Sequence, residues 1–217
     1  MIGLSPNSGS DGLSILCLGA HSDDIEIGAG GSLLTWLGQG LKFHVHWCVL
    51  SANGAREVEA CASADGFLKG ATSARIEIMQ LRNSFFPSQF SEIKMWFAAL
   101  KSRTKPDLIL THRGDDLHQD HREVSRHTWA TFRDQLILEY EIPKWDGDLA
   151  QPNLYVPIAA ETLQRKISLL LAHFGTQASK DWFDEDVFRG LARLRGTECR
   201  AAERFAEAFI ARKVVLR

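Results

Sequence analysis

The chain has 217 residues, of which 45% are hydrophobic and 24% are charged, so it can bury one sizeable apolar core and has no compositional sign of disorder. Its 25 Lys and Arg residues nearly balance its 27 Asp and Glu residues. The resulting charge of −2 gives no basic field of the kind that attracts nucleic acid, and we expect no nucleic-acid partner.

The N-terminal stretch lacks the basic and apolar segments of a secretory signal, and no run approaches the roughly 18 apolar residues of a membrane span. We therefore expect a cytoplasmic protein without an integral membrane segment. We also expect a single domain over 1–217, with a flexible leader over 1–12. The sequence leaves open whether the chain forms a homo-oligomer.

Strand-like and helix-like segments alternate along the chain. Short apolar runs predict strands, and amphipathic runs with capping signals predict helices. In chain order we expect strand 13–20, helix 28–40, strand 41–52, helix 56–68, strand 74–81, helix 91–103, strand 106–112, helix 119–134, strands 135–141 and 153–158, helix 160–174 and helix 199–212. This alternation predicts an α/β fold, a Rossmann-like three-layer α/β/α sandwich with a mostly parallel sheet.

The glycine-rich run at the start of helix 28–40 resembles a phosphate-binding loop only superficially. Gly28, Gly30 and Gly31 fit neither the G-x-G-x-x-G pattern nor a Walker loop with lysine. We interpret them as positions where the helix packs closely against a strand.

Two clusters of imidazole and carboxylate groups directly follow predicted strands. "AHSDD" ends strand 13–20, and "THRGDDLHQDH" ends strand 106–112. Because parallel strands present their carboxyl ends at one edge of a sheet, we expect both clusters at one rim. Imidazole and carboxylate without thiolate suit zinc or another divalent first-row ion. The clusters contain His21, Asp23, Asp24, His112, Asp115, Asp116, His118, Asp120 and His121.

The spacing within the first cluster allows two of its residues to bind a metal ion and a third to act as a base. His21 and Asp24 lie three residues apart, so one turn can direct both at a single ion, while Asp23 points elsewhere and is free to act as a base. In the second cluster, His118 and His121 have the same spacing and share a helix face.

Each cluster also has a simpler interpretation as a set of helix caps. Either aspartate of the first cluster could cap a helix that begins near Gly28, and Asp115 or Asp116 could cap the helix after His118. Two such clusters at equivalent strand ends favour the metal interpretation.

These motifs resemble those of the LmbE/PIG-L family of metal-dependent N-deacetylases. "AHSDD" followed by "GAGG" is similar to the first family motif, which usually reads A-H-P-D-D, and "DLHQDH" is similar to the second, which ends H-x-D-H. The resemblance extends to "REVEACASADGFLKG", "EIPKWDGDLAQPN" and "LRGTECRAAERFAEAF", and covers nearly the whole chain. Ser22 departs from the usual proline, and we expect looser turn geometry there without lost chemistry.

The resemblance implies a metal centre with Zn²⁺ or another divalent first-row ion as cofactor. By this resemblance His21, Asp24 and His121 bind the metal. Asp23 is implied as the general base, with water on the metal as the nucleophile.

The resemblance also implies roles around the substrate. His118 would face the reacting carbonyl, and Asp120 would orient it and keep it protonated so that it stabilises an oxyanion. Arg56 would bind substrate hydroxyls or a phosphate, although it could equally be a solvated arginine at a helix start. Trp145 and Asp146 lie in a polar loop suited to stacking on a sugar ring, and Trp145 could instead anchor the core.

The resulting functional hypothesis is a hydrolase that removes an acetyl group from an N-acetylated amino sugar or sugar conjugate. Hydrolysis of another amide, such as a thiol conjugate of the mycothiol type, is an alternative. A non-catalytic module that binds metal or sugar is a third. An unliganded Asp23 beside the ligand pair favours an enzyme, because a pure binder needs no base.

Overall fold

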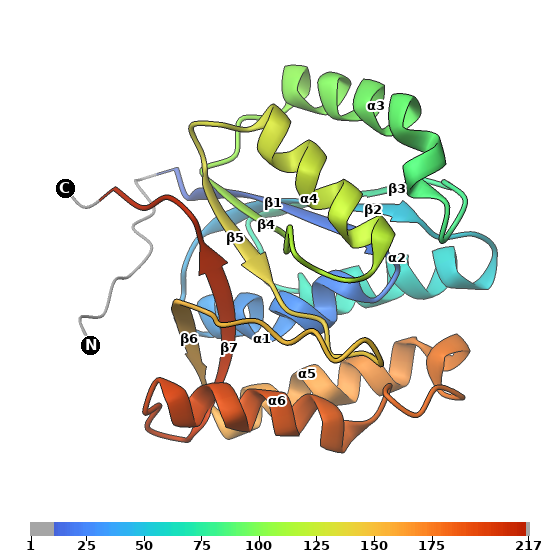
Figure 1. Cartoon of the computed structure of the whole chain (residues 1–217). Coiled ribbons are helices and arrows are strands. Elements are labelled where there is room, and N and C mark those ends of the chain that lie inside the picture. Colours follow the sequence, from blue (N-terminus) through green and yellow to red (C-terminus); the bar gives the residue numbers. More distant parts are fainter. Residues whose placement is uncertain (1–10, 216–217) are drawn as a thin grey trace.

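The computed structural model of the protein describes residues 11–215, so residues 1–10 of the expected leader lie outside the described residues. A seven-stranded sheet forms its centre (Figure 1). The elements are β1 (Leu13–His21), α1 (Asp24–Gly38), β2 (Phe43–Ser51), α2 (Ala55–Phe67), β3 (Ser73–Ile78), η1 (Phe86–Gln89), α3 (Phe90–Arg103), β4 (Leu108–His112), α4 (Gln119–Thr131), β5 (Leu136–Tyr140), β6 (Leu154–Ile158), α5 (Ala160–His173), η2 (Gly175–Gln177), α6 (Glu185–Glu198) and β7 (Phe205–Ala211).

The order of the strands creates a crevice at the middle of the sheet. The order is β3-β2-β1-β4-β5-β7-β6; neighbours from β3 to β5 pair in parallel, and β7 is antiparallel to both β5 and β6. The chain proceeds outward from β1 to β2 and β3, and outward in the other direction from β4 to β5. In open α/β sheets, ligands bind at such a reversal of strand order, at the carboxyl ends of the strands.

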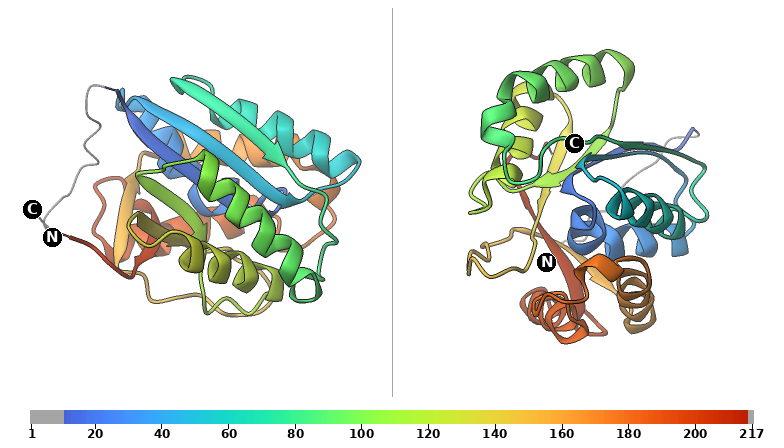
Figure 2. Two further views of the ribbon diagram at one scale, coloured as in Figure 1. Left: turned by 90° about the horizontal axis from the view of Figure 1, so that it is seen from above. Right: turned by 90° about the vertical axis from the view of Figure 1, so that its right-hand side faces the viewer.

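Helices cover both faces of this sheet, which confirms the predicted α/β class with a mostly parallel sheet. Helices α3 and α4 lie on one face, and α1, α2, α5 and α6 lie on the other (Figure 2). Within residues 11–215, none of the helices combines the length and apolar character needed to cross a membrane.

Strand β1 is buried on both sides because successive side chains point to opposite faces of a sheet. Ile15 and Cys17 pack into the core between the sheet and α1, α2 and α5. Leu16 and Leu18 pack into the second core, beneath α3 and α4. The uninterrupted apolar run before the first polar cluster therefore reflects a central strand, whose end is fixed rigidly in the crevice.

The glycines of α1 allow the helix to lie close to its neighbours, with Gly28 and Gly31 against strands, as predicted, and Gly30 against helix α2. A Cβ atom on Gly28 would overlap the Tyr140 ring, and one on Gly30 would lie 2.5 Å from the Phe67 ring. A Cβ atom on Gly31 would lie 2.8 Å from a carboxylate oxygen of Glu207. The close approach places the first turn of α1, with Asp24, directly beside the end of β1.

The predicted helix over 199–212 is wrong, because half of this segment forms strand β7 and the rest is not helical. Arg200 and Arg204 have φ angles of 56° and 66°, which end the preceding helix and turn the chain into the sheet. The Ala-, Glu- and Arg-rich composition favours a helix locally, but pairing with β5 and β6 overrides that preference. The helix lies earlier, as α6, where the Asp184 side chain caps the first turn by accepting from the Asp186 N–H at 2.7 Å.

An ionic cluster joins β2, β3 and α3, and we expect it to make stability depend on pH. Glu77 accepts from Trp96 Nε1 at 2.9 Å and from Arg103 at 2.6 Å, and it lies 3.1 Å from His46 Nε2. Burial alone would raise the pKa of Glu77, but these partners lower it from 4.5 to about 2. A carboxylate with a lowered pKa stabilises the folded state above its ordinary pKa and loses that effect as the pH falls.

Glu77→Gln should therefore lower the free energy of unfolding at pH 7, and its difference from wild type should shrink as the pH falls from about 4.5 toward about 2. Urea unfolding at pH 7, 5, 4 and 3 measures this, with exposed Glu92→Gln as the matched control. A difference that stays constant down to pH 3 would contradict the prediction.

Candidate functional site

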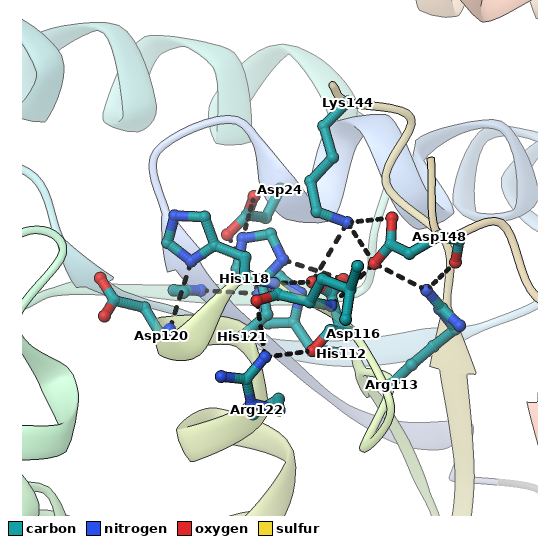
Figure 3. Close-up of polar contacts among 12 residues, drawn as sticks. Asp24, His112, Arg113, Asp116, His118, Asp120, His121, Arg122, Lys144 and Asp148 are labelled. Carbon is teal, nitrogen blue, oxygen red and sulfur yellow. Dashed lines mark hydrogen bonds and ion pairs between the residues drawn. The ribbon is translucent and has the colours of Figure 1, made fainter. Parts of the chain in front are cut away.

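The two polar clusters meet at the crevice between β1 and β4, as predicted. β1 ends at His21, and α1 begins at Asp24, so a tight turn holds the first cluster against the strand end. β4 ends at His112, and the second cluster occupies the loop and first turn that lead into α4. Figure 3 shows Asp24 of the first cluster beside His112, Asp116, His118, Asp120 and His121 of the second.

Donor atoms of three residues converge in this crevice, and Asp24 contributes both carboxylate oxygens. His21 Nδ1 lies 3.2 Å from His121 Nε2 and 3.4 Å from Asp24 Oδ2, and His121 Nε2 lies 3.5 Å from Asp24 Oδ1. Ligands bound tetrahedrally at the 2.0–2.1 Å typical of zinc are about 3.3–3.4 Å apart. The spacing of the three donors therefore fits a divalent ion of this size.

A carboxylate contacts the outer nitrogen of each of these two imidazoles. Asp116 Oδ2 lies 3.1 Å from His121 Nδ1, and Asp120 Oδ2 lies 3.3 Å from His21 Nε2. Carboxylates in this position accept a hydrogen bond from the outer N–H, which keeps the proton on that nitrogen and leaves the inner nitrogen free for a metal. The chemistry of the donor set thus also fits a divalent cation.

Burial and the neighbouring charges shift the pKa values of these groups in different directions. Burial alone would lower the pKa of His21, but Asp24 and Asp120 raise it to about 9. Burial and the adjacent His112 lower the pKa of His121 to about 3. Burial would raise the pKa of Asp24, but the surrounding histidines hold it well below its usual range.

His112 belongs to the same cluster, although the motif resemblance assigned it no role. Its Nε2 lies 3.0 Å from Asp24 Oδ2, and its ring stacks on His121 with centroids 3.9 Å apart. Donor atoms of Asp24, His112 and His121 lie within 4.8 Å of one another, so His112 offers an alternative ligand. The sequence signal that could have indicated this role is the position of His112 at the end of the strand before the second motif.

Asp23 is the member of the first cluster that stays outside the donor set. It occupies the N-cap position of α1, but its side chain makes no capping hydrogen bond among the described residues, so the capping interpretation of Asp23 is wrong. The residue is 3% exposed, and its Oδ2 has no hydrogen-bond partner within residues 11–215. Burial and the charge of Asp24 raise the pKa of Asp23.

Asp120 contacts His118 through its backbone and not, as expected, through its carboxylate. The Asp120 carboxylate instead lies against His21 and accepts from the backbone N–H groups of Ser84 at 2.6 Å and Phe86 at 3.1 Å. The Asp120 backbone N–H donates to His118 Nδ1 at 3.2 Å, which places the His118 proton on Nε2. Burial and the charge of His21 lower the pKa of His118, so this imidazole is neutral rather than held protonated.

The sequence pattern of the PIG-L family, described as GlcNAc-PI de-N-acetylase, matches residues 16–132, which is more than half of the chain. The protein belongs to the PIG-L family. The matched segment contains β1, β4 and both polar clusters. No curated protein matches the sequence significantly.

Solved structures share the PIG-L-like fold at low sequence identity. One is 4-carboxy-2-hydroxymuconate hydratase from Pseudomonas putida (TM-score 0.71, 18% identity, covering 94% of this chain and 98% of that chain). The conserved protein TT1542 from Thermus thermophilus has a TM-score of 0.70 with 20% identity (94% and 97%). N,N'-diacetylchitobiose deacetylase from Pyrococcus horikoshii has a TM-score of 0.66 with 17% identity (93% and 84%). These neighbours include a hydratase and a deacetylase, so the shared fold alone does not define the reaction.

The residues expected to bind substrate differ in their contacts with the first polar cluster. Arg56 contacts this cluster directly: its Nε donates to Ser22 Oγ at 3.1 Å, and its Nη2 lies 3.4 Å from Asp23 Oδ1. Ser22, the departure from the family motif, thus supports Arg56. Trp145 is 68% exposed and donates from Nε1 to Asp181 at 2.6 Å, so it is not a core anchor. Asp146 is exposed on the same turn and has no hydrogen bond or ion pair to the cluster among the described residues.

Proposed function

We propose that the protein is a divalent-metal-dependent hydrolase that removes an acetyl group from an N-acetylated amino sugar or sugar conjugate. The observation that carries this proposal is the buried, unliganded Asp23 beside the converging donors His21, Asp24 and His121. Membership of a family described by a de-N-acetylase supports the same reaction, as does the deacetylase among the neighbours in fold.

We propose His21, Asp24 and His121 as the ligands, with Asp116 and Asp120 holding the two imidazoles. Zinc is the first candidate because the donors suit it, and other first-row ions are the alternatives. When bound, such an ion would lower the pKa of a water molecule and polarise an acyl oxygen.

The remaining residues would move the protons and stabilise the developing charge. Asp23 would accept a proton from the attacking water and later donate it to the departing amine nitrogen, which is a role typically worth about 10² to 10⁴ in rate. His118 Nε2–H would donate to the acyl oxygen as that oxygen becomes negative. Arg56 would hold Asp23 in place and contact polar groups of the substrate, and Trp145 would offer a ring for a sugar to stack on.

Acetate release tests the proposal directly. The zinc-loaded protein should release acetate from at least one member of a panel of N-acetylglucosamine derivatives that includes UDP-linked, lipid-linked and inositol-linked sugars. Treatment with a chelator should abolish release, and adding back Zn²⁺, Co²⁺ or Mn²⁺ should restore it.

Each negative result points to a different part of the proposal. Release that survives complete removal of metal would exclude the metal-dependent mechanism. Metal binding without release from any sugar would exclude the amino-sugar substrate and favour another amide or a binding module. The cytoplasmic location, the single domain over 1–217 and the oligomeric state stay predictions.

A further inference from the structure

A buried ionic network ties the loop between β5 and β6 to the second polar cluster (Figure 3). Lys144 Nζ lies 2.6 and 2.7 Å from the two carboxylate oxygens of Asp148 and 3.1 Å from Asp116 Oδ1. The side chains of Lys144, Asp148 and Asp116 are only 7%, 8% and 1% exposed. Since an unpaired buried charge is strongly unfavourable, the position of each group depends on the other two.

Asp148 holds the loop over 113–117, which belongs to the second cluster. One of its oxygens, Oδ2, accepts from the Leu117 backbone N–H at 2.8 Å and from Arg113 Nη2 at 3.2 Å. The Arg113 guanidinium also donates to the backbone carbonyl of Asp148. The β5–β6 loop and the 113–117 segment are therefore bound to each other by both side chain and backbone.

The two oxygens of Asp116 are divided between this network and the proposed metal centre. Oδ1 accepts from the His118 backbone N–H at 2.8 Å and faces Lys144, whereas Oδ2 faces His121 Nδ1 at 3.1 Å. This orientation places the proton of His121 on Nδ1. His121 Nε2 is then unprotonated and faces the other two proposed metal ligands, His21 and Asp24.

We propose that Lys144 and Asp148 are positioning residues of the metal centre, which hold Asp116 in the orientation that fixes the tautomer of His121 and thereby set the affinity for metal. The inference rests on the metal site proposed above. Without the lysine, Asp116 would lose the cation that faces its Oδ1, whereas Asp148 would keep its ion pair with Arg113. Asp116 would then rotate, and it would no longer accept reliably from His121.

The test measures zinc affinity rather than turnover, by competition with a chromophoric chelator. Lys144→Met should weaken zinc binding about 10- to 100-fold, which is the usual effect of losing a group that orients a ligand, and Asp116→Asn should do the same. The double variant should bind no more weakly than Asp116→Asn, because both substitutions act through one hydrogen bond. Lys144→Arg should recover most of the affinity.

Lys166→Met is the matched control for removing a buried lysine. Lys166 is also buried and lies 2.6 Å from its carboxylate partner Glu207, but it lies on α5. This variant should lose stability and keep its zinc affinity within about twofold. Wild-type zinc affinity in Lys144→Met, or effects of Lys144→Met and Asp116→Asn that multiply, would overturn the inference.

A second measurement on the metal-free protein separates this inference from the proposed function. Long-range ¹H–¹⁵N NMR correlations should show His121 protonated on Nδ1 in the wild type and in Lys166→Met, and a mixture of tautomers in Lys144→Met. If the wild-type protein binds no zinc, the proposed metal site fails, but the tautomer still reports on positioning. An unchanged His121 tautomer in Lys144→Met would overturn the inference whatever the zinc result.

Discussion

Asp23→Asn should reduce acetate release by about 10² to 10⁴ and leave the zinc affinity within about twofold of wild type. Asparagine has the same shape but cannot accept the proton of the attacking water. Asp23 contacts Arg56 rather than the converging donors, so its loss should spare the metal. Acetate release and zinc competition on the same preparations measure both quantities, and exposed Asp65→Asn is the control.

Either of two results would contradict this role for Asp23. Turnover within tenfold of wild type would mean that another group accepts the proton, since a general base is worth at least about 10². Loss of zinc together with turnover would instead make Asp23 a ligand, and Asp24 and His112 would then need different assignments.

Gly28→Ala should lower the free energy of unfolding by about 3 kcal/mol, at the upper end of the range for overpacking. The new Cβ would overlap the ring of Tyr140, which is completely buried and donates from its hydroxyl to the Leu18 carbonyl at 2.6 Å. The ring is therefore held at both ends and cannot move aside easily. Urea unfolding measures the difference.

Gly190→Ala is the matched control, and we expect it to change the free energy of unfolding in the opposite direction. Gly190 lies in α6, and nothing lies within 4 Å of a Cβ placed there, so alanine should stabilise the protein by about 0.5–1 kcal/mol through helix propensity. If both variants are destabilised alike, general intolerance of glycine substitution explains the result better than overlap with Tyr140.

Most of the fold could be predicted because hydrophobic periodicity reflects burial. The central strands are apolar on both faces, and the helices α2 to α5 lie within a few residues of their predicted ranges. The C-terminal part could not be predicted, because β7 is a strand through its partners rather than its composition. Glu207 in the middle of β7 is unfavourable for a strand taken alone, but it accepts from the N–H groups of Gly31 and Ser32 and pairs with Lys166.

The site was predictable to the level of its motifs but not to the level of its hydrogen bonds. Strand ends placed the two clusters at one rim, and the family resemblance selected His21, Asp24 and His121 from them. Which imidazole Asp120 contacts depends on the backbone of a distant loop, whose Ser84 and Phe86 N–H groups hold the carboxylate against His21. No residue pattern near Asp120 encodes that loop.

The placement of β7 makes the order of folding differ from the order of synthesis. All three proposed metal ligands have been translated by residue 121, yet β6 pairs, within the described part of the chain, with β7 alone. Until β7 emerges and inserts between β5 and β6, a nascent chain exposes the open edge of β5, and exposed edges invite pairing with other chains. A growing polypeptide that already carries every proposed ligand would therefore still expose the unpaired edge of β5 until β7 inserts.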